Sequence, residues 1–578
     1  MGLLLLQGSA ALNPRELFAN NEQGLWLDPS DFPTMWQDAA GDTPVTAASD
    51  PVALILDKSR SGPSMGSNQV TNGGFGADSD WTKGTGWTIG SGVATKTAGS
   101  ASLLSQAQTM TAGRYYIVTY TITRTAGSIT PQFAGGSTVS GTARSTSGTF
   151  TDIMTVVSGN NTLQLSADAS FAGTVDNVSL KELSAGNHAF QTTSASRPTL
   201  ARIPSSGRRN LLTYSEQFDN AAWTKTGVTV SANQTANPAN GLTDADLLTE
   251  DSGLTNHGIS QTYTATAAAH TVSVYAKFGS HSHIEISLDQ SSSDAYAVFD
   301  IQNGTVANQG VGATGIATAL ASGWYRFSVT FTMTAGSKTA RIRLGASSTV
   351  FFYTGNGTRN TTLWGAQLET GSTATNYQKV AATTDVTESG VSDLWHLVFD
   401  GSDDSLTTNS VDMTGTAQMT VIAGVRKLSD AASGMVAELS ATASSNAGSF
   451  NFLSPRANGE ASFAFTLNGG SALNLRSYTG LAAPRTDVIS ATLDTTAADS
   501  AAAIAVRLNG ASTTGTEVVT AASTGNFGNH VLNIGRRNQA TIPFNGHIYQ
   551  LIIRGKTTPT GKLLEAERFV ARKTGVSI

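Results

Sequence analysis

Short runs in which apolar and polar residues alternate, separated by turns rich in Gly, Ser and Asp, recur along most of this chain. Residues 394–406 are an example, because the alternation enters an Asp-Gly-Ser-Asp-Asp turn and resumes through residues 419–425. A period of two is typical of a half-buried strand, and these turn residues let the chain reverse. The pattern predicts an all-β fold of several antiparallel β-sandwiches or jelly rolls. Residues 563–572 carry apolar side chains at helical spacing and predict one short C-terminal helix.

Size, charge and cysteine content exclude several classes of protein. The 578 residues exceed what one hydrophobic core accommodates, so several domains are expected. Charged residues make up 13% of the chain, against about 25% in an average globular protein. A formal net charge of −6 without a basic stripe argues against nucleic acid as a partner. The absence of cysteine excludes disulfides, thiolate metal sites and a cysteine nucleophile.

The N-terminal residues predict attachment to a partner rather than secretion or membrane insertion. The apolar run at residues 3–6 is short, and no Lys or Arg precedes it, unlike in a signal peptide. No other run reaches the roughly 20 apolar residues that span a bilayer. The run at residues 3–6 is expected to be either a structural N-terminal strand or an anchor onto a partner, and we assign residues 1–16 as an N-terminal anchor.

Two stretches of the chain repeat each other. Residues 68–81 and 210–223 both begin with Asn and reach a Trp-Thr-Lys sequence at the same spacing, with a Phe in between. Residues 174–180 and 362–368 correspond to each other as closing strands. Such internal similarity indicates two copies of one module type.

Five short motifs resemble pieces of the concanavalin-A-like (laminin-G-like) lectin domains of tailed-bacteriophage virion proteins. They are Gly-Leu-Trp-Leu-Asp-Pro-Ser-Asp at 24–31, Asp-Lys-Ser at 57–59, Gly-Asn-His-Ala at 186–189, Ser-Arg-Pro-Thr-Leu at 196–200 and Leu-Val-Phe-Asp-Gly-Ser-Asp-Asp at 397–404. The two repeats are similar to the carbohydrate-binding-like jelly rolls of phage tail fibres and adhesins, through residues 210–218 and 363–369. In such lectin domains the pieces often run nearly consecutively. The resemblance therefore implies one discontinuous sandwich that carries two inserted modules.

This resemblance leads to a prediction of six segments. They are an N-terminal anchor at 1–16, the first part of the sandwich at 17–60, jelly-roll module 1 at 63–184, a bridge of the sandwich at 185–206, jelly-roll module 2 at 207–380 and the main part of the sandwich at 381–578. The first part is too short to form a core alone. We therefore expect Trp26 and its neighbours to form an edge of the sandwich far downstream.

The resemblance implies a non-enzymatic virion protein, either a tail fibre or a receptor-binding adhesin that recognises host-surface glycan. It also implies other virion proteins as partners, an oligomer with a trimer favoured, and assembly in the host cytoplasm before display on the particle. Two alternatives stay open. One is a head fibre, capsid decoration or baseplate component without glycan binding, and the other is a capsular polysaccharide depolymerase.

Sugar binding needs an exposed aromatic face, with amide or charged groups nearby, and module 2 offers both. The candidate ligand-binding residues are Tyr275, Tyr296, Phe352, Tyr353, Asn356 and Arg359. Phe352 and Tyr353 are the best placed, because a Gly- and Asn-containing loop follows them. The tryptophans of this module, at 223, 324 and 364, are expected in the core.

The one cofactor that the sequence suggests is a structural calcium ion. Asp400, Asp403 and Asp404 could supply the carboxylate oxygens that calcium prefers. The alternative is an Asp-rich turn whose side chains accept hydrogen bonds from their own backbone.

No set of catalytic residues is evident. Glu285 and Asp289 lie four positions apart on a predicted strand, but they form a weak pair for glycoside hydrolysis. His281 and His283 would share a strand face, either as a metal pair or as surface histidines. The sequence has no nucleophile elbow, His-Glu-x-x-His motif or phosphate-binding loop. We therefore expect no enzymatic activity.

Overall fold

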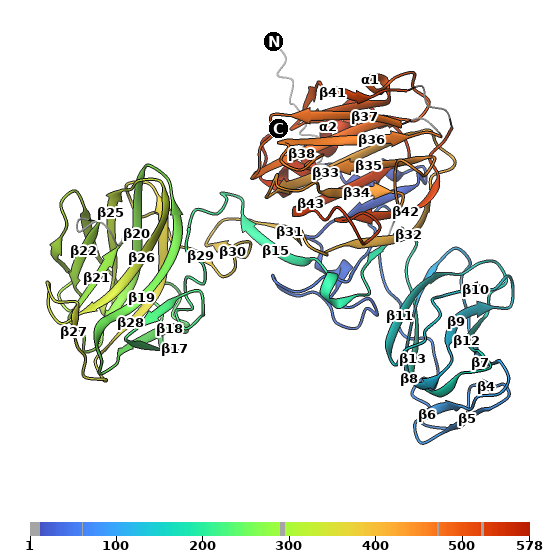
Figure 1. Cartoon of the computed structure of the whole chain (residues 1–578), viewed down its shortest axis with the longest axis horizontal. Coiled ribbons are helices and arrows are strands. Elements are labelled where there is room, and N and C mark those ends of the chain that lie inside the picture. The colour runs from blue at the N-terminus through green and yellow to red at the C-terminus, as the bar shows by residue number, and fades with distance from the viewer. Residues whose placement is uncertain (1–11, 61, 289–294, 471–472, 522–524) are drawn as a thin grey trace, which may run out of the picture. The chain divides into compact units, whose positions relative to one another are not determined.

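The computed structural model describes residues 12–60, 62–288, 295–470, 473–521 and 525–578. The predicted anchor at 1–16 lies largely outside these residues. The chain divides into two compact units, of which unit 1 comprises Met1–Ala201 and Trp395–Ile578, and unit 2 comprises Arg202–Leu394 (Figure 1). Nearly all regular structure is antiparallel β, which confirms the predicted fold class.

The larger part of unit 1 is a sandwich of two sheets. One sheet contains, in spatial order, β31 (Asp393–Asp400), β43 (Asn545–Arg554), β33 (Gln418–Lys427), β38 (Arg485–Asp494), β39 (Ile504–Leu508) and β40 (Ala511–Thr513). The other contains β2 (Met35–Trp36), β3 (Leu54–Ile55), β14 (Ala189–Phe190), β32 (Leu406–Asp412), β42 (Asn529–Ile534), β34 (Met435–Leu439), β35 (Ser449–Leu453), β36 (Ser462–Asn468), β37 (Leu473–Thr479) and β41 (Thr516–Val519). The inner faces of both sheets share one apolar core, in which Phe452 and Phe465 stack at 4.6 Å between ring centroids.

Strand β1 (Gly24–Leu27) belongs to the first sheet of this sandwich, because it pairs antiparallel with β43. All four of its residues are buried. The indole of Trp26 donates a hydrogen bond of 3.0 Å to Gln550, which is 524 positions away in the sequence. The amide of Gln550 in turn donates to the buried carboxylate of Asp28 (2.5 Å). Residues near the N-terminus therefore belong to a sheet that is built mainly from the last third of the chain.

Helix α2 (Thr560–Thr574) covers the outer face of the first sheet, where its buried residues Leu563 and Val570 pack against Trp26 and Ile552. The helix ends at Gly575, whose φ of 72° is the left-handed conformation that glycine adopts most easily. The predicted C-terminal helix is thus confirmed. The shorter helices are α1 (Ser500–Ala503) and the 3₁₀ helices at Pro14–Phe18, Phe32–Thr34, Ser194–Ser196 and Ala321–Gly323.

Unit 1 also contains module 1, a smaller two-sheet jelly roll. One sheet runs β10 (Val139–Ser140), β9 (Ile129–Ala134), β12 (Thr162–Ala167), β7 (Ser102–Ala107) and β4 (Thr82–Lys83). The other runs β11 (Gly148–Thr155), β8 (Tyr115–Ala126), β13 (Ala172–Glu182), β6 (Val93–Lys96) and β5 (Trp87–Gly90). Their facing residues, including Tyr116, Tyr120 and Phe133, form a separate core.

Unit 2 is the second jelly roll, and strand β15 (Thr199–Pro204) leads into it. One sheet runs β16 (Thr224–Thr226), β19 (Leu254–Ala265), β26 (Gly336–Gly345), β21 (His283–Ser287), β22 (Tyr296–Asp300) and β23 (Thr305–Gln309), and β27 (Phe352–Thr354) also pairs with β19. The other runs β17 (Val228–Ala236), β18 (Thr243–Glu250), β28 (Asn360–Thr370), β20 (Ala269–Phe278), β25 (Trp324–Thr332) and β24 (Thr314–Ala319). The hairpin of β29 (Gln378–Val380) and β30 (Val386–Glu388) closes the unit, which is therefore wider than the predicted range 207–380.

Candidate functional site

A buried carboxylate organises the connection between β26 and β28 in unit 2. Asn356 N–H donates to Glu250 Oε1 (2.8 Å), and the hydroxyl of Tyr353 donates to Glu250 Oε2 (2.7 Å). The ring of His281 contacts the same oxygen through Nε2 (2.5 Å), and Arg359 Nε lies 3.2 Å from Oε1. We call these five residues the Glu250 cluster. Three of them, Tyr353, Asn356 and Arg359, are predicted site residues, and the structure brings them together.

The electrostatics of the Glu250 cluster favour a charged carboxylate beside a neutral imidazole. Burial alone would raise the pKa of Glu250, but the hydrogen bonds from Asn356, Tyr353 and His281 lower it overall. Burial lowers the pKa of His281, against the opposing effect of Glu250. Burial and the adjacent Glu250 both raise the pKa of the Tyr353 hydroxyl. The cluster therefore combines a charged carboxylate with a neutral imidazole and the Arg359 guanidinium, and its contacts hold residues 353–359 in a fixed conformation.

Phe352 lies on the outer side of this connection. Strand β27 pairs with the start of β19 so that Phe352 is opposite Asn256 and Thr354 is opposite Leu254. Residues that pair directly across antiparallel strands share a face, so these four side chains lie on one surface, which we call the Phe352 face. Phe352 is 61% exposed and Leu254 is 64% exposed. Arg343 borders this face and donates to the side-chain oxygen of Asn256 (3.2 Å).

The remaining aromatic candidates do not join the Phe352 face. Tyr353 points inward and is 8% exposed, because alternate residues of a strand face opposite ways, so it supports the connection rather than offering a surface. Tyr275 packs on the other sheet against Trp364 and Tyr377, with ring centroids 5.2 and 5.9 Å away. Tyr296 lies on β22, separated from β19 by β26 and β21. The tryptophans at 223, 324 and 364 are buried, as expected.

Sequence reasoning missed Leu254, Asn256 and Glu250. Leu254 and Asn256 reach Phe352 only through the pairing of β19 with β27, and Glu250 reaches Tyr353 across 103 positions of sequence. The expectation that His281 and His283 share an exposed strand face is wrong, because His281 precedes β21 and is buried against Glu250. The four-apart pairing of Glu285 with residue 289 cannot be described, since residue 289 lies outside the described part of the chain.

Glu285 itself forms an ion pair. Its Oε1 accepts hydrogen bonds from Arg343 Nη2 (2.5 Å) and Nε (3.2 Å). Glu250 and Glu285 therefore each form an ion pair with an arginine.

The three predicted calcium ligands do converge on the sandwich of unit 1. Carboxylate oxygens of Asp400, Asp403 and Asp404 all lie within 4.8 Å of one another, and among the described residues this is the one such group of potential metal ligands. Burial, with the adjacent charges of Asp400 and Asp403, raises the pKa of Asp404 to about 7. Oxygen donors so close together suit a hard divalent cation. The turn alternative also has support, because Asp400 accepts from the backbone N–H of Ser402 (2.7 Å) and Asp404 accepts from that of Asp400 (3.0 Å).

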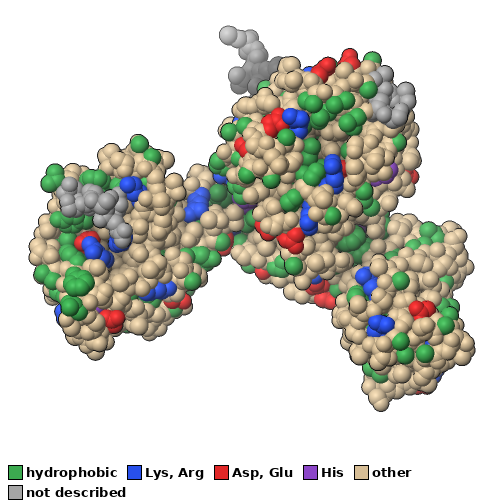
Figure 2. All heavy atoms as spheres, in the orientation of Figure 1, with side chains coloured by type: hydrophobic (Ala, Val, Ile, Leu, Met, Phe, Trp, Pro, Cys, Tyr) green, Lys and Arg blue, Asp and Glu red, His purple; other side chains and the backbone are tan. Residues whose placement is uncertain are grey.

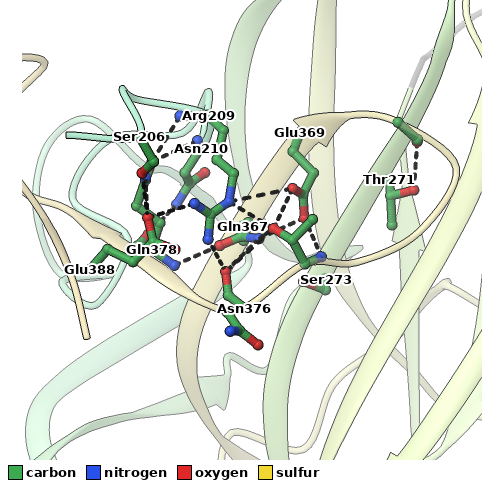
Figure 3. A network of polar contacts seen from close by, with 12 residues as sticks. Ser206, Arg209, Asn210, Thr271, Ser273, Gln367, Glu369, Asn376, Gln378 and Glu388 are labelled. Atoms are coloured by element: carbon green, nitrogen blue, oxygen red, sulfur yellow. Dashed lines mark hydrogen bonds and ion pairs between the residues drawn. The ribbon is translucent and has the colours of Figure 1, made fainter. Parts of the chain in front are cut away.

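A second polar network in unit 2 joins the segment that enters the jelly roll to the segment that leaves it (Figure 3). Arg209 donates to Glu388 (2.6 Å) and lies 3.8 Å from Glu369. The side chain of Asn210 donates to the carbonyl oxygens of Ala366 (3.0 Å) and Gln378 (3.0 Å). Asn210 is fully buried, and its polar atoms are satisfied within the protein. This network therefore closes the fold rather than binding a ligand.

Module 1 has the same closing contacts at corresponding positions. Asn68 Oδ1 accepts from Leu180 N–H (3.0 Å), as Asn210 Oδ1 accepts from Leu368 N–H (3.1 Å). Trp81 donates to Asn72 O (3.1 Å), as Trp223 donates to Tyr214 O (3.0 Å). Gln106 pairs with both backbone groups of Thr71, as Gln261 does with those of Thr213. The sequence repeat thus corresponds to a repeated hydrogen-bond pattern.

Comparisons with known proteins give distant structural likenesses only. No family model matches the chain, and no curated protein matches it. A carbohydrate-binding module, the Ruminococcus gnavus IT-sialidase CBM40, is 12% identical with a TM-score of 0.21, over 26% of this chain and 83% of that one. The receptor-binding domain of botulinum neurotoxin type G is 10% identical with a TM-score of 0.22, over 30% of this chain and 42% of that one. A heptameric SAP-like pentraxin from Limulus polyphemus is 14% identical with a TM-score of 0.21, over 29% of this chain and 78% of that one.

Likenesses at this level say nothing about what this chain binds, so its function must be argued from its own residues. The chain covers less than half of the neurotoxin chain that it matches. Within the described residues, no helix has both the length and the apolar character that a membrane crossing requires.

Proposed function

We propose that this protein is a non-enzymatic adhesin whose unit 2 binds glycan on the Phe352 face. The observation that carries the proposal is the exposure of Phe352 and Leu254, 61% and 64%, on a connection fixed by the Glu250 cluster. Contiguous exposed apolar surface that is bordered by polar residues is typical of binding sites.

The chemistry of the Phe352 face suits a saccharide. An aromatic ring packs against the C–H groups of a pyranose, while the amide of Asn256 and the hydroxyl of Thr354 can exchange hydrogen bonds with sugar hydroxyls. The Glu250 cluster holds the connection in one conformation before binding, which reduces the entropy lost when a ligand is bound. On the face of this unit that Figure 2 shows, hydrophobic side chains are surrounded mainly by uncharged ones. A shallow face of this kind binds weakly, with an expected Kd near 1 mM, or about −4 kcal/mol.

The setting that we propose is a phage particle. The motifs at 24–31 and 397–404 resemble those of virion lectin-like domains, and residues near the N-terminus would attach to other virion proteins. Display as an oligomer, with a trimer favoured, would turn weak sites into strong attachment when several can engage one cell surface. The host-surface glycan would then be the receptor.

The test uses the full chain on an array of bacterial surface oligosaccharides and polysaccharides. We expect the wild-type protein to bind a defined set of glycans and Phe352→Ala to lose about tenfold in affinity, equivalent to about 1.4 kcal/mol. The matched control is Val311→Ala, which removes a side chain that is 83% exposed elsewhere on unit 2 and should leave binding unchanged. An array without any bound glycan, or equal binding by wild type and Phe352→Ala, would contradict the proposal.

A structural component of the particle is the second candidate. Strands β23 and β24 are edge strands of the two sheets of unit 2, and residues 305–320 carry no charge. Val306, Ile316 and Val311 on this edge are 38%, 48% and 83% exposed. Soluble proteins usually protect edges with charged residues, so this edge suits contact with another protein. Immunogold labelling of the head, together with a silent glycan array, would favour this candidate.

The depolymerase alternative receives less support from the residues near the Phe352 face. Glycoside hydrolysis requires two carboxyl groups that face one bond, whereas Glu250 and Glu285 are each paired with an arginine. Release of reducing ends from a bound polysaccharide would revive this alternative.

A further inference from the structure

A cleft of about 620 Å³ opens in unit 1 where module 1 meets the sandwich. Its module-1 wall includes Ser140, Thr142 and Asp152, and its sandwich wall includes Asn409, Ser410 and Asn529. A smaller cavity of about 200 Å³ adjoins it and shares Tyr115 and Ser410 with it. We call the two together the junction cleft. The lining residues include members of β10 and β11 of module 1 and of β32 and β42 of the sandwich, and these strands are labelled in Figure 1.

The two walls are fixed to each other by contacts beside the cleft. Leu54 and Leu56 of the sandwich pack with Ile117 and Leu183 of module 1 in one buried apolar cluster. Asn409 donates from its side chain to Ile153 O (3.3 Å). The cleft is therefore preformed, and its volume lies within the roughly 300–1,000 Å³ that is usual for ligand sites, which are frequent at domain interfaces.

A second set of contacts holds module 1 at its closing strand. The ammonium group of Lys181 on β13 donates to the carbonyl oxygens of Ala40 (3.0 Å) and Gly41 (3.2 Å), and it forms an ion pair with Asp42. A lysine with three protein acceptors is held in one orientation, which limits rotation of module 1 against the sandwich.

The charges of the junction cleft are balanced. Asp152, the charged residue of the larger cavity, lies 3.0 Å from Arg144 and also accepts from Tyr120 (3.1 Å) and Thr142 N–H (2.9 Å). The smaller cavity has one residue of each sign, Arg60 and Asp412. A strongly charged ligand would therefore gain little here.

The uncharged lining is rich in groups that both donate and accept hydrogen bonds. Asn409, Asn529 and Asn187 contribute amides, while Ser140, Thr142 and Ser410 contribute hydroxyls. The partly buried Tyr115 adds an aromatic side chain where the two cavities meet. Amides and hydroxyls around an aromatic residue match a molecule that alternates hydroxyl and C–H groups.

We propose that the junction cleft is a second binding site, which accepts a neutral oligosaccharide. It lies in unit 1 and shares no residue with the Phe352 face, so it does not depend on the function proposed for unit 2. Ser410 lies at its centre because it borders both cavities.

The experiment uses the full chain with Phe352→Ala as the background, so that the unit 2 site does not contribute. Isothermal titration with neutral tetrasaccharides of glucose, galactose, mannose or N-acetylglucosamine should show binding by at least one of them. Ser410→Trp fills the cleft and should weaken that binding at least tenfold. Asn529→Trp, on the neighbouring strand, should do the same if the first variant folds poorly.

The matched control is Thr516→Trp, which places the same bulk on an exposed residue of β41 outside the cleft. It should bind as the background protein does. Unchanged affinity in a folded Ser410→Trp or Asn529→Trp protein would overturn the proposal. So would the absence of binding by all four sugars. Binding by the Phe352→Ala protein that Ser410→Trp weakens would show that the junction cleft binds independently of the Phe352 face.

Discussion

Module 1 and unit 2 are built on the same closing contacts, yet the connection that precedes the closing strand differs between them. In both, a leading asparagine, Asn68 or Asn210, accepts a hydrogen bond from the closing strand. The connection that precedes this strand comprises residues 168–171 in module 1 and residues 346–359 in unit 2. The short connection is a turn, whereas the long one contains β27, two of the four residues of the Phe352 face and most of the Glu250 cluster.

This difference separates the parts that close the fold from the part that we propose binds a ligand. The repeated motifs, such as Trp-Thr-Lys and the residues around Gln367, form hydrogen bonds that are internal and satisfied. Exposed aromatic surface occurs instead where unit 2 departs from module 1. Fold likeness between the two modules is therefore a poor guide to where either of them binds.

The largest effect is expected from the carboxylate that organises each connection. Glu250→Ala removes the acceptor of three donors, from Tyr353, Asn356 and His281, and should lower the free energy of local opening by about 3–5 kcal/mol. Asp168→Ala, in the short turn of module 1, removes hydrogen bonds from the more exposed Ser128 and Ser170 and should cost about 1 kcal/mol. Hydrogen exchange of peptides spanning residues 346–359 and 168–171 measures both. Equal losses would mean that the long connection is not specially fixed.

The closing asparagines give the next comparison. Asn210 is fully buried and makes bonds with four backbone groups, so Asn210→Ala should destabilise unit 2 by about 3 kcal/mol. Asn68 is exposed and accepts from two N–H groups, so Asn68→Ala should cost module 1 about 1 kcal/mol. Hydrogen exchange in β28 measures the loss of stability in unit 2, and hydrogen exchange in β13 measures the loss in module 1. A larger loss for Asn68→Ala would contradict the ranking by burial.

Lowering the pH should reduce the local stability of unit 2 more than that of module 1, because the range 63–184 contains no histidine. The pKa of His281 is lowered by burial, so the unfolded state binds more protons than the folded state as the pH falls below 6.5. Unit 2 should therefore lose about 1 kcal/mol of local stability between pH 7 and pH 5, after allowance for partial solvent screening. The lowered pKa of Glu250 extends the loss below pH 4.5.

The measurement is hydrogen exchange of residues 346–359 across this pH range, corrected for intrinsic rates. His281→Asn should remove the part of the pH dependence that lies between pH 7 and pH 5. Strands β7 and β12 of module 1, which are in the sheet that does not contain the His188 contact Tyr115, should show none of it. A response of the same size in module 1 would show that histidine titration is not the cause.

The smallest effect concerns the acidic turn of the sandwich, which belongs to neither module. The pKa of Asp404 is raised to about 7, so its ionisation costs stability as the pH rises from 4 to 8. Asp404→Asn should therefore stabilise the calcium-free sandwich at pH 8 by about 1 kcal/mol or less, after discounting for solvent screening. We propose that calcium stabilises the wild type and not this variant, which thermal unfolding with calcium or a chelator would test. Equal changes in unfolding temperature on adding calcium to the wild type and to the variant would contradict a calcium site at this turn.

Features that depend on residues close in sequence could be predicted more completely than contacts between distant segments. The alternation of residues 394–406 and the helical spacing of residues 563–572 predict β31 and α2 correctly, since both depend on neighbours in sequence. Asp400, Asp403 and Asp404 converge because one turn contains them. The sequence also predicts that Trp26 joins a distant sheet, and β1 does pair with β43.

The candidate site could be predicted only in part. Phe352 was identifiable because a Gly- and Asn-containing loop follows it, but the inward orientation of Tyr353 follows from the pairing of β27 with β19. Leu254 and Asn256 carry no sequence signal of their own. Glu250 is one of many acidic residues until the fold places it beneath Tyr353 and His281. Sites assembled across strands need the register of those strands, which a single sequence does not specify.

The most direct test of the central claim is hydrogen exchange of the full chain with and without a saturating concentration of a glycan selected on the array. The account predicts slower exchange in residues 346–359 and at the start of β19, and no change in residues 168–171 of module 1. Slower exchange in the short turn, or no change in residues 346–359 while the glycan is bound, would contradict it.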